Sequence, residues 1–127
     1  MHILVPLEPA YDYARVRRFV ETVGRMVASA DPEAATLEWD MARRGPRVFI
    51  DHNQNVGGKT TAAVYSVRPR PGAPVSTPLL WSEIGDIDPA TFTITTIWER
   101  LRRHGDLYAP VLTGSQRLEG PETALGL

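Results

Sequence analysis

The longest helical pattern in the chain runs from about Ala10 to Ala30. Apolar residues recur there at steps of three and four positions, at Val16, Phe19, Val20, Val23, Met26 and Val27. Because an α-helix turns once every 3.6 residues, this spacing places all of them on one face. Arg15, Arg18 and Arg25 fall mostly on the opposite, polar face. We therefore predict an amphipathic helix over residues 10–30.

A second helix is predicted between Asp31 and Gly45. Asp31 suits the N-cap position and Pro32 the first turn, where proline fits because its missing N–H is not needed. Leu37 and Met41 lie four positions apart and form the inner stripe of this helix. Gly45 and the proline after it end the helix.

Three segments have the composition of β-strands. Val48, Phe49 and Ile50 form a continuous apolar run, which is typical of a strand covered on both faces. The predicted strands are Ile3–Leu7, Arg47–Asp51 and Thr60–Val67. Together with the helices they predict an α/β (or α+β) fold, in which a short mixed or antiparallel sheet packs against the two N-terminal helices.

The second half of the chain has weaker patterns. Residues 68–78 contain four prolines and one glycine, which favours a loop with polyproline character over a helix or a central strand. Residues 79–84 are consistent with a helical turn. Residues 92–97 alternate as in a strand, yet residues 96–105 could equally form a helix that ends at Gly105. From Gly114 onward apolar residues are few, so we expect a frayed tail.

Composition limits the classes of protein that this chain can represent. At 127 residues it has room for one domain, and no apolar run approaches the roughly 20 residues that cross a bilayer. It contains no cysteine, which excludes disulfides and thiolate metal sites. The start of the chain lacks the plan of a signal peptide, so we expect a cytoplasmic protein. The net charge of −1 means that any site for a polyanion must be local.

The stretch GGKTT, residues 57–61, is similar to part of a nucleotide-binding P-loop but does not complete that motif. The P-loop needs a glycine five positions before Gly58, where this chain has Asn53. The residues after Lys59 are also typical of a strand, so no helix N-terminus is available for phosphates. A glycine-containing turn between two strands is the better interpretation.

Asp51 follows the apolar run Val48–Ile50, at the position where a buried strand ends. Ligands of open α/β sheets bind at the carboxyl ends of strands, and a carboxylate there suits Mg²⁺ or Mn²⁺. The alternative is that Asp51 caps its own loop by accepting hydrogen bonds from nearby backbone N–H groups. Local sequence leaves both interpretations open.

Arg68 and Arg70 alternate with two prolines, whose restricted φ angles reduce the freedom of the segment. Two guanidinium groups held near one another suit a triphosphate, although two solvated arginines on a loop remain an alternative. His2 precedes the first predicted strand. By itself it carries no functional assignment.

Taken together, two stretches resemble the polymerase domain of bacterial DNA ligase D, a member of the archaeo-eukaryotic primase superfamily that acts in non-homologous end joining. They are HILVPLEPAYDYARVRRF, residues 2–19, and RRGPRVFIDHNQNVGGKTTAAVYSVRPRPGAPVSTPLLWSEI, residues 43–84. The resemblance covers residues 1–106 and implies the C-terminal half of a primase-polymerase core. Residues 107–127 depart from the family and are expected to form a divergent, partly disordered tail.

The resemblance also implies roles for individual residues. Members of the family use two divalent metal ions, Mg²⁺ or Mn²⁺, for template-directed nucleotidyl transfer at DNA ends. Asp51 matches a catalytic aspartate that binds metal. The positions that match groups near the incoming nucleoside triphosphate are His2, Arg44, Gln54, Arg68 and Arg70.

The family also uses an Asp-x-Asp pair and a Ser/Gly-rich turn, and neither is present before His2. One carboxylate cannot build a two-metal site, so the chain alone is expected to be inactive and to need self-association or a partner chain. The other interpretation is a non-catalytic half-domain that binds nucleotide or protein, either as one subunit of a split polymerase or as a remnant. The sequence does not identify the sugar preference.

Overall fold

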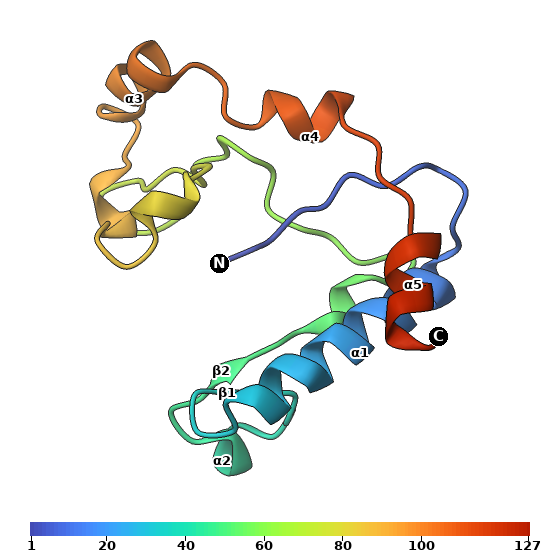
Figure 1. Cartoon of the computed structure of the whole chain (residues 1–127). Coiled ribbons are helices and arrows are strands. Elements are labelled where there is room, and N and C mark those ends of the chain that lie inside the picture. Colours follow the sequence, from blue (N-terminus) through green and yellow to red (C-terminus); the bar gives the residue numbers. More distant parts are fainter. The chain divides into compact units, whose positions relative to one another are not determined.

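A computed structural model describes all 127 residues of the chain (Figure 1). Two compact units make up the structure, and each is described by itself. The first contains Met1–Pro6 and Thr61–Gln116, and the second contains Leu7–Thr60 and Arg117–Leu127. None of the helices combines the length and the apolar character that crossing a membrane requires.

The second unit is built on α1, Tyr13–Ala30, which begins at Asp12. The Asp12 carboxylate accepts the N–H of Arg15 at 2.7 Å, as an N-cap does. The unit also contains β1 (Ala35–Thr36), α2 (Met41–Arg44), β2 (Val48–Phe49), the 3₁₀ helix η1 (His52–Gln54) and α5 (Glu119–Leu125). The helix predicted over residues 10–30 is therefore confirmed, three residues shorter at its start.

The two strands of this unit are parallel. Ala35 pairs with Val48 and Thr36 with Phe49. Gly24 is the one buried residue of α1, and a Cβ atom there would lie 3.1 Å from Cγ2 of Ile50. The absence of a side chain at this position therefore lets α1 approach the segment that follows β2.

The first unit contains less regular structure. Its elements are the 3₁₀ helices η2 (Trp81–Glu83) and η3 (Pro89–Thr91), followed by α3 (Ile97–His104) and α4 (Ala109–Thr113). Val75, Phe92 and Ile97 are buried and form its small core. The predicted turn at residues 79–84 is confirmed by η2. Of the strand and the helix that the sequence allowed near residues 92–105, the structure has the helix α3, which ends where Gly105 adopts a φ of 68°.

The α/β class is confirmed, but several predicted elements are wrong. The helix expected from Asp31 to Gly45 is replaced by a turn, β1 and the short α2. Asp31 does accept the N–H of Ala34 at 3.1 Å, yet the chain then extends because Val48 N–H donates to the Ala34 carbonyl at 2.8 Å. Strand pairing therefore prevails over the local helical pattern, and the resulting sheet is parallel rather than mixed or antiparallel.

The other predicted strands also differ from the structure. Residues 3–6 form no strand, because no other segment pairs with their backbone as a ladder. The segment 60–67 forms none either, since Tyr65 has a φ of 60° that interrupts an extended chain. Residues 47–51 contribute only Val48–Phe49 as β2, and Val48 is 67% exposed instead of covered on both faces.

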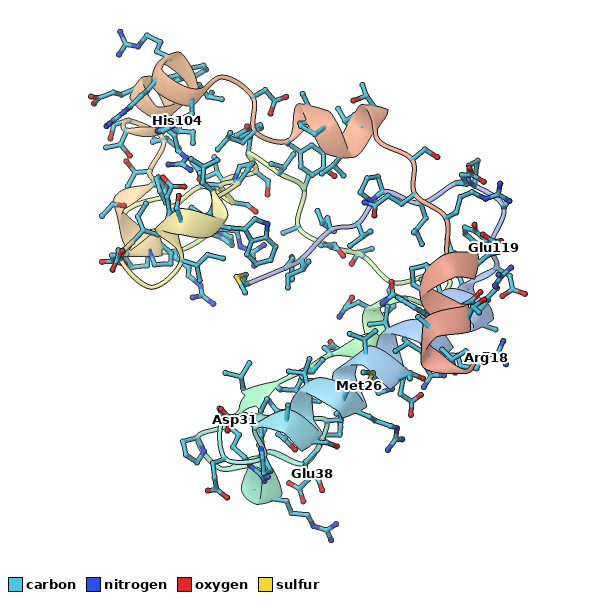
Figure 2. The ribbon with its side chains drawn as sticks, viewed as in Figure 1. Arg18, Met26, Asp31, Glu38, His104 and Glu119 are labelled. Atoms are coloured by element: carbon cyan, nitrogen blue, oxygen red, sulfur yellow. The ribbon has the colours of Figure 1, made fainter.

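Two expectations about exposure also need correction. Part of the apolar face predicted on α1 is open to solvent, and Met26, labelled in Figure 2, is 52% exposed. The tail expected to be frayed contains α5, and Leu118 just before it is 3% exposed, the lowest value among the core residues. The backbone N–H of Leu118 donates to the hydroxyl of Tyr11, 107 positions away, where a local pattern cannot reveal a partner.

Candidate functional site

Asp51 stands where β2 has ended and η1 begins. Its Oδ1 atom accepts the N–H of Asn53 at 2.9 Å, and its Oδ2 atom accepts the side-chain amide of Gln54 at 3.2 Å. The loop cap that local sequence allowed is thus observed. Each carboxylate oxygen has a second lone pair, so the cap leaves acceptor capacity on Asp51 for a ligand.

The loop that carries Asp51 is held against α1 by two side-chain contacts. Arg17 donates to the side-chain oxygen of Asn53 at 2.8 Å. One turn further along α1, Glu21 Oε2 lies 3.7 Å from Nε2 of His52. The pKa of Glu21 is lowered, chiefly by its hydrogen bond with Arg25 and further by the nearby His52. These contacts fix where the Asp51 loop lies on the helix.

Sequence reasoning missed the residues that anchor this loop. His52 is enclosed, with a side chain 12% exposed, and its Nδ1 atom is buried without a hydrogen-bond partner. The spacing of Arg17 and Glu21 at i and i+4 shows only that they share a face of α1. No pattern of neighbouring residues predicts that this face contacts residues 52 and 53, which lie more than thirty positions away.

Arg44 lies at the end of α2 and its guanidinium is already engaged. Nε donates to the carbonyl of Glu38 at 3.2 Å, and Nη2 donates to the carbonyl of Trp39 at 3.0 Å. The group also lies over the ring of Phe49, 4.1 Å from its centroid, in a cation–π contact. Because a guanidinium has five N–H donors, these two bonds leave three that face no protein acceptor.

Arg68 and Arg70 belong to the other unit and extend from a tightly bonded turn. Arg70 N–H donates to the carbonyl of Arg68 at 2.8 Å around Pro69, and Ala73 N–H donates to the carbonyl of Arg70 at 2.9 Å. Both side chains are exposed and form no hydrogen bond or ion pair within the chain. The backbone here is therefore ordered, while the two guanidinium groups remain free for an anion.

The six predicted site residues are divided between the two units. Asp51 and Gln54 are in direct contact, and Arg44 belongs to the same unit. His2, Arg68 and Arg70 belong to the other unit, where all three are exposed. Within each unit, only the pair Asp51–Gln54 is joined by a bond.

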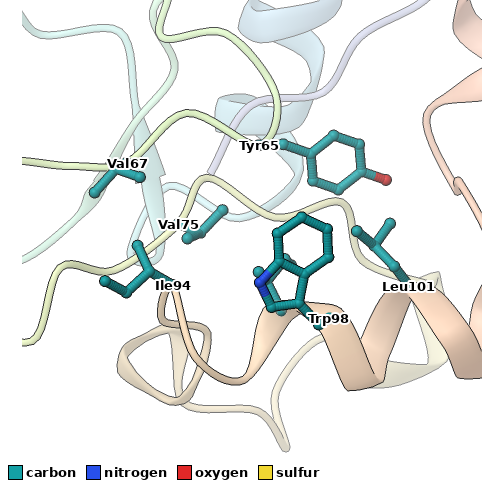
Figure 3. Close-up of a pocket in the computed structure, with 7 residues that line it drawn as sticks. Tyr65, Val67, Val75, Ile94, Trp98 and Leu101 are labelled. Atoms are coloured by element: carbon teal, nitrogen blue, oxygen red, sulfur yellow. The ribbon is translucent and has the colours of Figure 1, made fainter.

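The unit that contains Arg68 also has an apolar pocket of about 160 Å³ (Figure 3). It is lined by Tyr65, Val67, Val75, Ile94, Ile97, Trp98 and Leu101. Tyr65 closes one side and its hydroxyl donates to Asp106 at 2.7 Å. Burial, followed by this hydrogen bond, raises the pKa of Tyr65 to about 12. The phenol is therefore a neutral donor throughout the physiological range.

The carboxylates and histidines of this chain do not by themselves fit a two-metal centre. No group of three or more histidine, aspartate or glutamate side chains is placed to hold a metal ion. Asp51 is followed in sequence by His52, whose Nε2 atom lies 3.7 Å from Glu21 Oε2 on α1. A hexacoordinate Mg²⁺ would thus find one protein carboxylate at Asp51 and would need further oxygen ligands from elsewhere.

Comparisons with a family model and with known proteins all match this chain to the same family. The family model of the LigD primase-polymerase domain matches residues 1–108. The bifunctional non-homologous end joining protein LigD of Bacillus subtilis is 32% identical over 107 residues, which is 83% of this chain. The multifunctional non-homologous end joining protein LigD of Pseudomonas aeruginosa is 34% identical over 90 residues, or 71% of this chain.

A solved structure supports the same relationship at the level of the fold. The polymerase domain of Mycobacterium tuberculosis ligase D, in complex with DNA, superposes with a TM-score of 0.76 and 29% identity over 87% of this chain. The chain spans only 39% of that domain, 18% of the Bacillus subtilis protein and 11% of the Pseudomonas aeruginosa protein. The predicted site residues, from His2 to Arg70, all lie in the stretch that the family model matches.

Proposed function

This chain belongs to the family of LigD primase-polymerase domains, and on that premise we propose that it contributes part of a nucleotidyl-transfer site for repair of DNA ends. The observation that carries the proposal is Asp51, a carboxylate at the carboxyl end of a parallel strand within the family-matched stretch. Its unused lone pairs make it one metal ligand, and Gln54 beside it orients the carboxylate.

The cationic residues supply the second part of the proposal. In nucleotidyl transfer, a primer hydroxyl attacks a phosphorus atom and pyrophosphate leaves, so negative charge accumulates on the triphosphate. Arg68 and Arg70 have guanidinium groups without protein partners, and Arg44 has three free N–H donors, so all three suit phosphate oxygens. His2 is an exposed further donor.

The chain alone is proposed to lack polymerase activity. Two divalent cations normally assist this reaction, and Asp51 is the only one of their carboxylate ligands that we assign to these 127 residues. The remaining ligands are proposed to come from a partner chain or from further sequence. A single-nucleotide extension assay with Mn²⁺ tests this point, with Asp51→Ala as the blank. Incorporation above that blank contradicts the proposed inactivity.

Binding of a nucleoside triphosphate is the direct test of the retained site. We expect calorimetric titration with nucleoside triphosphate and Mn²⁺ to show binding that weakens at least about tenfold in Arg68→Ala with Arg70→Ala. Loss of charge-assisted hydrogen bonds worth about 1.5–3 kcal/mol each accounts for that change. The matched control is Arg102→Ala with Arg103→Ala, which removes two exposed arginines of α3 from the same unit.

The two outcomes of this titration separate the candidate functions. Equal weakening in both double variants means that the four arginines act only through net charge, and it refutes a specific site at Arg68 and Arg70. No binding by the unmodified chain favours the other candidate, a non-catalytic half-domain that binds protein.

The exposed apolar side chains of α1 are the observation that favours such a partner. Val23, Met26 and Val27 lie on the apolar face of the helix and remain open to solvent. We propose that this face associates with a partner chain or with a second copy of this one. Sedimentation velocity on the purified chain tests self-association, which is excluded if a monomer persists at high concentration.

A further inference from the structure

The acidic helix α5 is bound to a basic part of α1. Arg15 donates through Nε to Glu122 Oε1 at 2.9 Å and through Nη2 to Glu122 Oε2 at 2.5 Å. The same Nη2 atom lies 3.3 Å from Glu119 Oε1. Two parallel bonds from a guanidinium fork to two oxygens are also the geometry with which arginine holds a phosphate group. Glu122 thus occupies Arg15 in the way that a phosphate would.

Further contacts keep α5 in this position. The hydroxyl of Tyr11 donates to Glu119 at 2.8 Å and accepts the N–H of Leu118 at 3.1 Å. The hydrogen bond from Arg15 lowers the pKa of Glu122, so this carboxylate stays ionised at neutral pH. The side chain of Leu118 is buried beside them. The contact therefore combines a short apolar anchor with a charged pair at the surface.

A cavity of about 390 Å³ lies beside this pair and is lined by Arg15, Arg18, Glu122 and Leu127. Arg18 is exposed, and its side chain makes no hydrogen bond or ion pair. Figure 2 labels Arg18 on α1 and Glu119 on α5. Because residues 15 and 18 are three positions apart on one helix, both side chains lie on the same face. One guanidinium of this face is free, and the other is engaged by carboxylates.

The helix that supplies those carboxylates lies outside the family match. The LigD primase-polymerase model matches residues 1–108, whereas α5 spans Glu119–Leu125. Arg15 and Arg18 are inside the matched stretch. The basic face thus belongs to the family-matched part of the chain, and its acidic partner does not.

We propose that Arg15 and Arg18 form a binding site for backbone phosphates of DNA, and that α5 is a displaceable cover whose Glu119 and Glu122 occupy it. The choice of DNA as the polyanion rests on the proposed function. Binding then exchanges the carboxylate pair on Arg15 for phosphate oxygens, and no covalent step is involved. Segment 117–127 is released from α1 when DNA is bound.

The first experiment removes the competing charges while keeping the shape of α5. Glu119→Gln with Glu122→Gln should raise the affinity for a fluorescent DNA oligonucleotide, measured by anisotropy, because two more phosphates are contacted. Each phosphate that is neutralised makes the plot of log binding constant against log salt concentration steeper by about 0.9. Two additional phosphates should therefore steepen this slope by about 2. The matched control is Glu33→Gln with Glu99→Gln, two exposed glutamates without ion pairs.

If Glu119→Gln with Glu122→Gln and the control Glu33→Gln with Glu99→Gln show equal DNA affinity and equal salt slope, the proposal is wrong, because net charge alone then explains any gain in affinity. Adding Arg15→Gln and Arg18→Gln to Glu119→Gln with Glu122→Gln should return both quantities to their starting values. Inorganic pyrophosphate serves as competitor. If pyrophosphate binds the variant while DNA does not, the site accepts small phosphates only and the assignment of DNA is wrong.

A further test uses the unmodified chain, so its result does not depend on the effect of any substitution on folding. Hydrogen exchange of amides in residues 117–127 should become faster when DNA is added, since the cover is released. Unchanged or slower exchange refutes displacement. Neither measurement uses nucleoside triphosphate, metal or primer extension. A chain that does not bind nucleoside triphosphate can therefore still show displacement of α5 by DNA. Equally, a chain that binds nucleoside triphosphate can show no displacement, so the two proposals are refuted by different results.

Discussion

The ion pair between Glu83 and Arg100 is predicted to be the main polar support of the unit that contains α3. Arg100 donates to both oxygens of Glu83, at 2.8 and 2.6 Å, and also to the carbonyl of Pro78 at 2.8 Å. Its guanidinium lies 4.8 Å from the centroid of the Phe92 ring. The two side chains are only 10% and 19% exposed, so solvent screens their interaction less than at an open surface.

The change Glu83→Gln removes the charge and keeps the size of this side chain. The hydrogen bond from Arg100, with a second from the backbone of Leu80, lowers the pKa of Glu83 from 4.5 to about 2. At about 1.4 kcal/mol per pKa unit, this depression of about 2.5 units sets an upper bound of about 3–4 kcal/mol on the stabilisation. Partial exposure reduces the figure, and we expect the free energy of unfolding to fall by about 1.5–2 kcal/mol at pH 7.

Urea unfolding followed by tryptophan fluorescence measures this difference as a function of pH. The folded state depresses the pKa of Glu83, so its contribution is complete above pH 4.5 and is lost as the pH falls toward 2. The gap between the unmodified chain and Glu83→Gln should close over that range. Glu99→Gln, an exposed position without an ion pair, is the control and should change stability by less than about 0.5 kcal/mol. A gap that is small at pH 7, or that does not depend on pH, refutes the reasoning.

Two further predictions concern the other anchors. Tyr65, whose pKa is raised to about 12 by burial and by Asp106, should give an ionisation step near pH 12 in an ultraviolet titration, and Tyr65→Phe should remove that step. If the step near pH 12 is unchanged in Tyr65→Phe, the step does not belong to Tyr65 and the prediction is wrong. Leu118→Ala should lower the free energy of unfolding by about 2–4 kcal/mol, because its side chain is buried at 3% exposure. Calorimetry checks this value, and a loss below 1 kcal/mol would mean that α5 is not anchored there.

Local rules predicted the elements whose signals are complete within a few residues. The N-terminal helix follows from the spacing of its apolar residues, and Gly105 ends α3 because it readily adopts a positive φ. The contact between Asp51 and Gln54 is also local, since it spans three positions of a capped turn. These features require no knowledge of distant parts of the chain.

Predictions failed where distant segments decide the conformation. Ala35 and Thr36 belong to a locally helical pattern, yet they pair with Val48 and Phe49 and become a strand. The anchors of the Asp51 loop, Arg17 on Asn53 and Glu21 beside His52, were likewise invisible to local reasoning. Backbone groups must find hydrogen-bond partners somewhere, and only the folded chain shows which distant partners they find.

The sequence by itself determined the α/β class and the family resemblance, because these depend on residue type and short spacing. The residues that it assigns to phosphate and metal remain a proposal. Tertiary structure alone decided that α5 folds onto Arg15, that Arg17 and Glu21 of α1 hold the Asp51 loop, and that the Arg68 and Arg70 side chains have no protein partner. Those facts depend on contacts between residues far apart in the chain. Whether a charged group is available to a ligand is settled by its neighbours in space.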